Sequence, residues 1–488
     1  MLDEGTEAIL SQGQEVGLLA LRAFPLGVLV QSNHDELDEA LTRTQRLIAD
    51  PQVPAIFEAT FRHQGVLVRV DILERASPKG WRLIEVKSTT GVKDYHLFDV
   101  AIQRHVVSGC GIDVAAACLM HLNRDYVYDG QEYRIRKLFK IEDVTKEIRK
   151  INRDLPTLLE DQWKALNRKS PPNIEPGPQC EDPVGCEFYD QCNETLPADH
   201  VSCLPRISQT KIAALVDQGI SLISEIPNDF PLGVLARRAC DSMQGGGTWF
   251  SGGLREELRR LKYPLSFMDF ETLYPAIPRY AGMRPYSHIP FQWSVHRQHR
   301  PGEQLEHFEF LARDDSDPRG GFIESLCRAA EGKGHIVVYN RSFEASRLAE
   351  LAAWLPDYAG QVEQIRERLW DLLPIIRGHV YHPGFHGSYS IKNVLPALIP
   401  GMMYSGMEIA DGGQAGLAWD RLIRDDLDEA QKEDLRRALL AYCAQDTLAM
   451  ARILQYLQSA GTRPSDDSRD SGWGRRPGAN FMGRTVGS

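Results

Sequence analysis

Two carboxylates, Asp269 and Glu271, stand one residue apart at the end of a short apolar run in the segment YPLSFMDFETLY, residues 263–274. An apolar run of this length predicts a buried strand, and side chains two residues apart on a strand point to the same face. Two adjacent buried carboxylates repel each other unless a cation lies between them. A hard divalent cation with oxygen ligands is the natural partner. The alternative is a strand end with two solvated acids.

Two further acids follow on predicted helices of the same half of the chain. The apolar segment 336–340 predicts another short strand, which leads into RSFEASRLAEL and places Glu344 in the first turn of a helix. In the later stretch LLAYCAQDTLAM, Tyr442 and Asp446 are four residues apart and therefore share one face of a helix. A Glu in a first helical turn also commonly complements the helix dipole, so the pattern depends on all the acids together.

The order of these acids, on a predicted strand, a helix and a later helix, resembles the ribonuclease H-like 3′–5′ exonucleases of the DEDD class. The resemblance implies that Asp269, Glu271, Glu344 and Asp446 bind Mg²⁺ or Mn²⁺. It also implies that Tyr442 positions the attacking water. One position departs from the pattern, because the third acid is usually Asp and here it is Glu344.

A second chemical centre is predicted between residues 55 and 90. AIFEATF and VLVRVDIL predict two strands around the turn RHQG, and WRLIEVKST predicts a third strand after the turn SPKG. Asp71 lies near the end of the second strand, while Glu85 and Lys87 share one face of the third. Such a set can hold Mg²⁺ or Mn²⁺ and stabilise charge at a phosphate. A surface hairpin with an ordinary Glu–Lys pair is the alternative.

This layout resembles the PD-(D/E)XK nuclease fold, in which Asp71, Glu85 and Lys87 would be catalytic. Gln103, in the helix-like stretch YHLFDVAIQRHVV, matches a substrate-contacting Gln of that family. The first helix, SQGQEVGLLALRAFP, resembles that of RecB-type nucleases, many of which carry a metal-binding His where this chain has Gly17. Glu15 is the candidate substitute.

Four of the nine cysteines crowd one segment, as Cys180, Cys186, Cys192 and Cys203. Their spacing is loose for a zinc ribbon, which usually has CxxC knuckles. The element GCEFYDQC resembles the cysteine segment of iron–sulfur RecB-type nucleases, which implies a 4Fe-4S cluster. That family has a ligand before the first helix, whereas the first cysteine here is Cys110, so Cys203 is the candidate fourth ligand. Zinc, or buried thiols without metal, are the alternatives.

Length and composition indicate a globular protein of several domains, and the resemblances described above imply the α/β fold class. A chain of 488 residues with 42% hydrophobic and 25% charged residues is long enough for two or three globular domains. The expected units are a RecB-like PD-(D/E)XK (restriction-endonuclease-like) domain, a cysteine segment, a helical hairpin with linker, a ribonuclease H-like domain and a disordered tail, over residues 1–178, 179–203, 204–257, 258–460 and 461–488.

The net charge of −11 excludes an overall basic footprint for nucleic acid, although a groove needs only local Lys and Arg. The sequence shows no signal peptide and no apolar run long enough to span a membrane, so a cytoplasmic protein with no membrane partner is expected. Its cysteines are then not expected to form disulfides.

The whole pattern resembles an uncharacterised bacterial family that fuses these modules. It implies a metal-dependent nuclease acting on single-stranded DNA or RNA, with 3′–5′ exonuclease activity in the C-terminal domain and a second RecB-like site. Two alternatives remain: a nucleic-acid-binding scaffold with one or both sites degenerate, and a structural partner in an antiviral defence or DNA repair assembly. In GSYSIKNVLPAL, the residues Ser390, Lys392 and Asn393 either contact the substrate strand or cap a helix.

Overall fold

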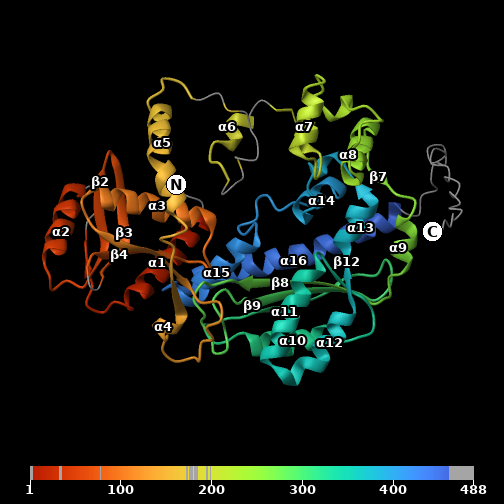
Figure 1. Cartoon of the computed structure of the whole chain (residues 1–488). Coiled ribbons are helices and arrows are strands. Elements are labelled where there is room, and N and C mark those ends of the chain that lie inside the picture. Colours follow the sequence, from red (N-terminus) through yellow and green to blue (C-terminus); the bar gives the residue numbers. More distant parts are fainter. Residues whose placement is uncertain are drawn as a thin grey trace, which may run out of the picture.

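The protein is a mixed α/β structure built on two separate mixed sheets (Figure 1). The computed structural model describes residues 4–31, 36–76, 79–171, 174, 180, 185–193, 196–197 and 199–460. The α/β class expected from the sequence is therefore confirmed. The predicted disordered tail, 461–488, lies outside the described residues. None of the described helices combines the length and the apolar character needed to cross a membrane.

The first sheet has six strands in sequential order. The β2–β3 hairpin turns at Gln64 and Gly65, whose φ angles of 49° and 82° suit the two-residue turn that matches strand twist. β3 and β4 are antiparallel, and β4 and β5 are parallel. The strands are β1 (Val28–Leu29), β2 (Ala55–His63), β3 (Val66–Arg75), β4 (Trp81–Lys87), β5 (Val114–Leu122) and β6 (Phe139–Asp143).

Helices cover both faces of this sheet because its strands alternate apolar side chains on the two sides. Leu73 and Leu83 pack in one core with the buried face of α3. Ile72 and Ile84 pack in the other core with Val16 of α1. The helices of this unit are α1 (Glu4–Leu21), α2 (Leu37–Ala49), α3 (Asp94–Gly109), α4 (Ile135–Leu138) and α5 (Arg149–Leu166).

The second sheet has the order β10-β9-β8-β11-β12 and places the MDFET strand at its centre. β8 is antiparallel to β9 and parallel to β11. Three antiparallel strands are thus followed by two parallel ones. The strands are β8 (Leu265–Leu273), β9 (Ile289–Gln298), β10 (Glu306–Leu311), β11 (Ile336–Val338) and β12 (Leu369–Asp371).

Two helical layers enclose the second sheet. Met268 and Phe270 point to the layer of α10 (Arg319–Ala329), α11 (Arg341–Trp354) and α12 (Ala359–Glu367). Phe267 and Leu273 point to the opposite layer, which contains α15 (Gly412–Arg424) and the long α16 (Glu429–Ala460). Figure 1 shows α16 in blue running along β8 and β9, with α10 to α12 on the other side of the strands.

Within residues 204–257, where a helical hairpin with linker was expected, the glycine-rich stretch 243–253 contains a paired strand. Trp249 and Phe250 form β7, which pairs antiparallel with β13 (Val380–Tyr381). Arg238 also lies over the Trp249 ring, 4.9 Å from its centroid. The aromatic pair therefore decides this segment, although the surrounding glycines suggested a linker.

The helical segment before the second sheet joins that sheet's core instead of forming its own. Leu215, Ile223 and Ala239 are buried in one cluster with residues of α16. The elements of this part and of the adjoining C-terminal segments are η2 (Val201–Cys203), α7 (Gln209–Val216), η3 (Ile223–Glu225), α8 (Val234–Gly245), α9 (Leu254–Arg259), α13 (Leu372–His379), η5 (Pro383–Phe385) and α14 (Ile391–Leu398).

The two sheet-bearing units contact each other through the loop after β8. The backbone N–H of Tyr128 donates to Met283 O (2.9 Å), and that of Gly282 donates to Tyr128 O (2.8 Å). Ala276 and Ile277 are buried in the core beneath α1 of the first unit. The segment that follows Asp269 and Glu271 is thus anchored on the N-terminal unit.

Candidate metal sites

The C-terminal site is built by β8 and α16. Burial raises the pKa of Asp269 well above its usual range, and the neighbouring carboxylate of Asp446 raises it further. Burial also raises the pKa of Glu271, with additional contributions from Asp269 and Asp446. The structure therefore brings these three acids together, as a cation-binding set would require.

The third acid, Glu344, is held in place by the start of α11. Asn340 precedes the helix in the left-handed region, with φ of 80°. The carboxylate of Asp371 accepts the backbone N–H groups of Asn340 and Arg341, each at 3.0 Å. Glu344 is 1% exposed, and burial followed by the charge of Asp269 raises its pKa. All four acids predicted from the sequence therefore lie in one site.

This site fits divalent cations. Within the described structure, Glu344 Oε2 is buried and has no hydrogen-bond partner. A buried carboxylate oxygen without a donor is costly unless a cation compensates it. Oxygen-rich sets of this kind suit Mg²⁺ or Mn²⁺.

Cys443 lies beside the carboxylates of this site and is buried. Among the described residues, one atom each from Asp269, Glu271 and Cys443 forms a group whose members all lie within 4.8 Å of one another. Burial raises the thiol pKa well above its usual value, and the charges of Asp269 and Glu271 add to this shift. A neutral thiol is a poor ligand for a hard cation, so Cys443 acts as packing beneath the carboxylates.

Two residues near Asp446 extend the site beyond the predicted set. Tyr404 O–H donates to Asp446 Oδ1 at 2.5 Å, and sequence reasoning missed it because it lies in an irregular segment without periodicity. Lys392 Nζ lies 5.9 Å and 5.8 Å from the ring centroids of Tyr404 and Tyr442. Burial raises the pKa of Asp446 to about 6, opposed by the Tyr404 hydrogen bond and the charge of Lys392.

Of the two roles considered from the sequence for the GSYSIKNVLPAL segment, the structure shows the helix cap. Ser390 caps α14, since its side chain accepts the backbone N–H of Lys392 at 3.3 Å. The cap places Lys392 in the first turn of the helix, where its charge lowers the pKa of both Glu271 and Asp446. Lys392 is thus the cation that the chain itself supplies to this acid cluster.

The N-terminal site lies on the α3 face of the first sheet. Asp71 accepts the backbone N–H of Val86 at 2.6 Å, and Lys87 Nζ donates to Glu85 Oε1 at 2.8 Å. Gln103 Nε2 donates to Glu85 Oε2 at 2.7 Å. The structure therefore brings Asp71, Glu85, Lys87 and Gln103 together.

Burial sets the charge state of this second site. It raises the pKa of Asp71 to about 6, an effect opposed by the hydrogen bond from Val86 and reinforced by the charge of Glu58. Burial and the charge of Asp71 raise the pKa of Glu85 well above its usual value. Two coupled carboxyl groups that resist ionisation have the same requirement for a cation as the C-terminal site.

Two acids of the N-terminal site were missed by sequence reasoning. Asp99, one helical turn before Gln103, pairs with Lys87 Nζ and accepts from Gln103 Nε2 at 3.1 Å. The four-residue spacing of Asp99 and Gln103 was the available signal. Glu58 interrupts the β2 ladder at φ of 56°, and burial raises its pKa.

The structure does not bring Glu15 to this site. Glu15 lines a hollow beside Tyr133, Arg279 and Arg424 instead. At Gly17, where RecB-type relatives carry His, an added Cβ would have no described neighbour within 4 Å. Position 17, which holds Gly, therefore contributes no side-chain ligand to the N-terminal site.

No three of the four crowded cysteines lie close enough in the described structure to share a single metal ion. Cys186 N–H donates to Cys180 O at 2.8 Å, and Cys192 lies on α6 (Tyr189–Asn193). Cys203 packs against the C-terminal core instead. Across the described residues, these thiols do not form a group of three with sulfur atoms within 4.8 Å of one another.

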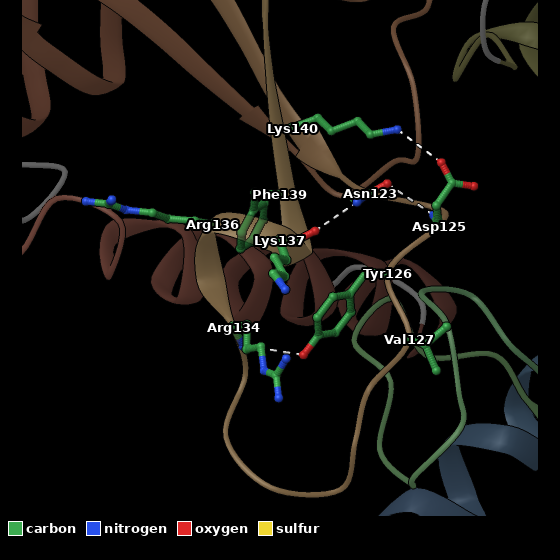
Figure 2. A pocket seen from close by; sticks show the side chains of 9 residues that line it. All are labelled: Asn123, Asp125, Tyr126, Val127, Arg134, Arg136, Lys137, Phe139 and Lys140. Atoms are coloured by element: carbon green, nitrogen blue, oxygen red, sulfur yellow. Dashed lines mark hydrogen bonds and ion pairs between the residues drawn. The ribbon is translucent and has the colours of Figure 1, made fainter.

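A cationic hollow of about 450 Å³ lies on the N-terminal unit, around α4 (Figure 2). Lys140 is bonded to Asp125 at 3.2 Å and Arg134 to Asp129 at 2.8 Å. Arg136 and Lys137 are exposed, and no ion pair within the described part of the chain includes either. The acidic chain thus carries a locally positive surface.

Both acid clusters predict a pH-dependent need for cations. A carboxyl whose pKa is raised on folding stabilises the protein at low pH, and this stabilisation is lost as the pH rises through the folded pKa, about 6 for Asp71 and Asp446. In EDTA, we expect the melting temperature to fall between about pH 5 and pH 8. Mg²⁺ or Mn²⁺ at about a hundredfold its Kd should restore about 2.7 kcal/mol at the higher pH. If neither Mg²⁺ nor Mn²⁺ raises the melting temperature at pH 8, the metal assignment is contradicted.

Comparisons with known proteins find similarity over part of this chain. Residues 266–390 match the family described as "Domain of unknown function (DUF2779)", a range that contains Asp269, Glu271 and Glu344. The chain is 30% identical over 219 residues to "Uncharacterized protein MG366 homolog" of Mycoplasma pneumoniae. The aligned residues make up 41% of this chain and 33% of that protein. The chain therefore spans about a third of the length of this curated relative. No solved structure matches the chain significantly.

Proposed function

We propose that this protein is a metal-dependent nuclease that hydrolyses phosphodiester bonds of single-stranded DNA or RNA, with 3′–5′ exonuclease activity at the C-terminal site. The observation that carries the proposal is the convergence of Asp269, Glu271, Glu344 and Asp446, all with raised pKa values, around an unpartnered carboxylate oxygen. The second sheet, with three antiparallel strands followed by two parallel ones, supports the resemblance to a ribonuclease H-like domain.

Each residue of the C-terminal site has a separate role in the proposed hydrolysis. The four acids would hold two divalent cations, which supply an activated water and stabilise the leaving oxygen. Tyr404 orients the Asp446 carboxylate by its hydrogen bond. Tyr442 positions the attacking water, and Lys392 stabilises negative charge on the phosphate. No side chain has to act as nucleophile, so no covalent intermediate is expected.

The N-terminal site is proposed as a second, RecB-like nuclease centre. Asp71 and Glu85 would hold Mg²⁺ or Mn²⁺, and Lys87 would stabilise charge at the phosphate. Its position on the α3 face beside Gln103 supports this assignment. The absence of a side chain at Gly17, where RecB-type nucleases carry a metal-binding His, favours the alternative of a degenerate site that binds nucleic acid without cleaving it.

The test of the proposed function is cleavage of end-labelled single-stranded DNA and RNA with Mg²⁺, with Mn²⁺ and with EDTA. Cation-dependent release of mononucleotides from the 3′ end is expected. Cation-dependent binding without cleavage would favour the scaffold, and a protein that neither cleaves nor binds would favour a structural partner in a defence or repair assembly.

The cationic hollow is expected to contribute to strand binding by phosphate contacts. Arg136→Glu and Lys137→Glu should each weaken binding and lower the slope of log K against log salt by about 0.7, the value for a single-strand contact. Fluorescence anisotropy over a range of salt concentrations measures both effects. Arg255→Glu, an exposed arginine on α9, serves as the matched control. An unchanged salt slope would show that the hollow does not contact the strand.

Iron content tests the cofactor expected from the cysteine segment. Because no three of these thiols lie within 4.8 Å of one another in the described structure, no step of the reaction is assigned to a cluster. Cys180, Cys186 and Cys192 remain the proposed ligands, and anaerobically purified protein is expected to be brown with about four iron atoms per chain. Cys186→Ser should reduce the iron content. Zinc in place of iron would identify a structural zinc site, and the absence of both metals would exclude either cofactor.

A further inference from the structure

Four aromatic rings form a continuous row at the contact between the two units. The ring centroids of Tyr286 and Tyr274 are 5.1 Å apart, and those of Tyr274 and His288 are 4.4 Å apart. The His288 and Phe343 centroids follow at 5.8 Å. We call Tyr286, Tyr274, His288 and Phe343 the aromatic row.

Each end of the aromatic row lies beside one candidate metal site. Tyr286 O–H donates to the carbonyl oxygen of Ser88, the residue after Lys87. At the other end, Phe343 directly precedes Glu344, and the adjacent ring of His288 is hydrogen-bonded through Nδ1 to Oγ1 of Thr272, the residue after Glu271, at 2.8 Å. The row therefore connects the two acid clusters across the contact between the units.

Three further observations describe the exposure and the charge of the row. Tyr274 is 49% exposed, although large apolar side chains are normally covered. Phe343, which precedes the acid Glu344, has the Arg347 guanidinium 5.3 Å from its ring centroid. Burial and the charge of Arg347 lower the pKa of His288 to about 4, so its ring is neutral and aromatic at neutral pH. The row thus offers one exposed ring, Tyr274, continued by three half-buried rings, with a cation at one end.

We propose that the aromatic row is the stacking surface for a single strand of nucleic acid that passes from one acid site to the other. The inference rests on the proposed nuclease function and adds the path of the strand. Unpaired bases stack on aromatic side chains irrespective of sequence, while their phosphates remain free to reach the neighbouring sites. The bases of a duplex already stack on each other, so the row selects single strands.

The experiment measures strand binding without cleavage, in the Asp269→Asn, Lys87→Ala double variant. Labelled oligothymidylate and oligouridylate of about 20 nucleotides are titrated by fluorescence anisotropy, with a duplex of the same length for comparison. Adding Tyr274→Ala is expected to weaken single-strand binding about tenfold, whereas Tyr274→Phe should change it by less than about twofold because the ring is kept. Phe308→Ala, at an exposed phenylalanine on the edge strand β10, is the control and should leave binding unchanged.

The proposal would be overturned if Tyr274→Ala bound the single strand as tightly as its parent does, or if it lost equal affinity for duplex and single strand. It would also be overturned if the parent bound no strand. Hydrolysis of the p-nitrophenyl ester of thymidine 5′-phosphate separates the row from the nuclease, since this probe needs an acid site but no strand path. In otherwise unchanged protein, Tyr274→Ala should leave it intact. Ester hydrolysis with Tyr274-independent binding would refute the row alone. Tyr274-dependent binding with no hydrolysis of any substrate would refute the nuclease and keep the row.

Discussion

Replacing Asp269 by asparagine is expected to lower the rate of 3′-end hydrolysis by on the order of a thousandfold. Asp269 has the central position in the C-terminal site, because its charge contributes to the raised pKa values of both Glu271 and Glu344. An amide at this position removes the charge that holds a cation between the carboxylates. Release of labelled mononucleotides under single-turnover conditions with Mn²⁺ measures the loss.

Stability measurements separate this effect from misfolding. Since burial raises the Asp269 pKa, the neutral amide removes repulsion, and Asp269→Asn in EDTA at about pH 8 should be at least as stable as the parent. Its stabilisation by Mn²⁺ should be reduced at the same time. Asp357→Asn, at an exposed acid outside the site, should change neither property. Unchanged cleavage by Asp269→Asn, with the N-terminal site also disabled, would refute the C-terminal assignment.

Removing Lys87 in the Asp269→Asn background is expected to abolish the remaining cleavage, with a loss of about a hundred- to a thousandfold. In that background, residual hydrolysis reports on the N-terminal site alone. Lys87 Nζ contacts both Glu85 and Asp99, and no other cation is bonded to Glu85 in the described structure. Lys87→Ala therefore removes the charge that would stabilise the phosphate.

A structural role for Lys87 has to be distinguished, because loss of a half-buried lysine leaves its partner carboxylates unpaired. Lys87→Met retains the apolar stem, so it should recover melting temperature relative to Lys87→Ala without recovering cleavage. Recovery of cleavage by Lys87→Met would show that Lys87 acts by packing. If Asp269→Asn alone leaves no cleavage, the N-terminal site is degenerate and the Lys87 prediction fails with it.

The local parts of both sites could be predicted from the sequence because they depend on the repeat of a single element. The period of two on a strand places Asp269 with Glu271, and Glu85 with Lys87, on one face. The period of the helix does the same for Tyr442 and Asp446. These relations hold whatever the elements pack against.

Tertiary structure decided what no single period specifies. Tyr404 contacts Asp446 from an irregular segment, and Asp99 contacts Lys87 from another element. Neither contact could be predicted from the spacing of residues along the chain. The glycine-rich stretch at 243–253 lies in the segment 204–257, which was expected to contain a linker. Trp249 and Phe250 instead form a strand that pairs with β13, more than a hundred residues later.

The meeting of the two units is the clearest case of this division. The motifs around Lys87 and Glu271 could each be recognised in the sequence. Their connection by the aromatic row depends on the hydrogen bonds between the loop after β8 and the N-terminal unit. Backbone period fixes the direction of a side chain within its own element. The distance between elements is fixed by which apolar surfaces pack together, and that is a property of the whole chain.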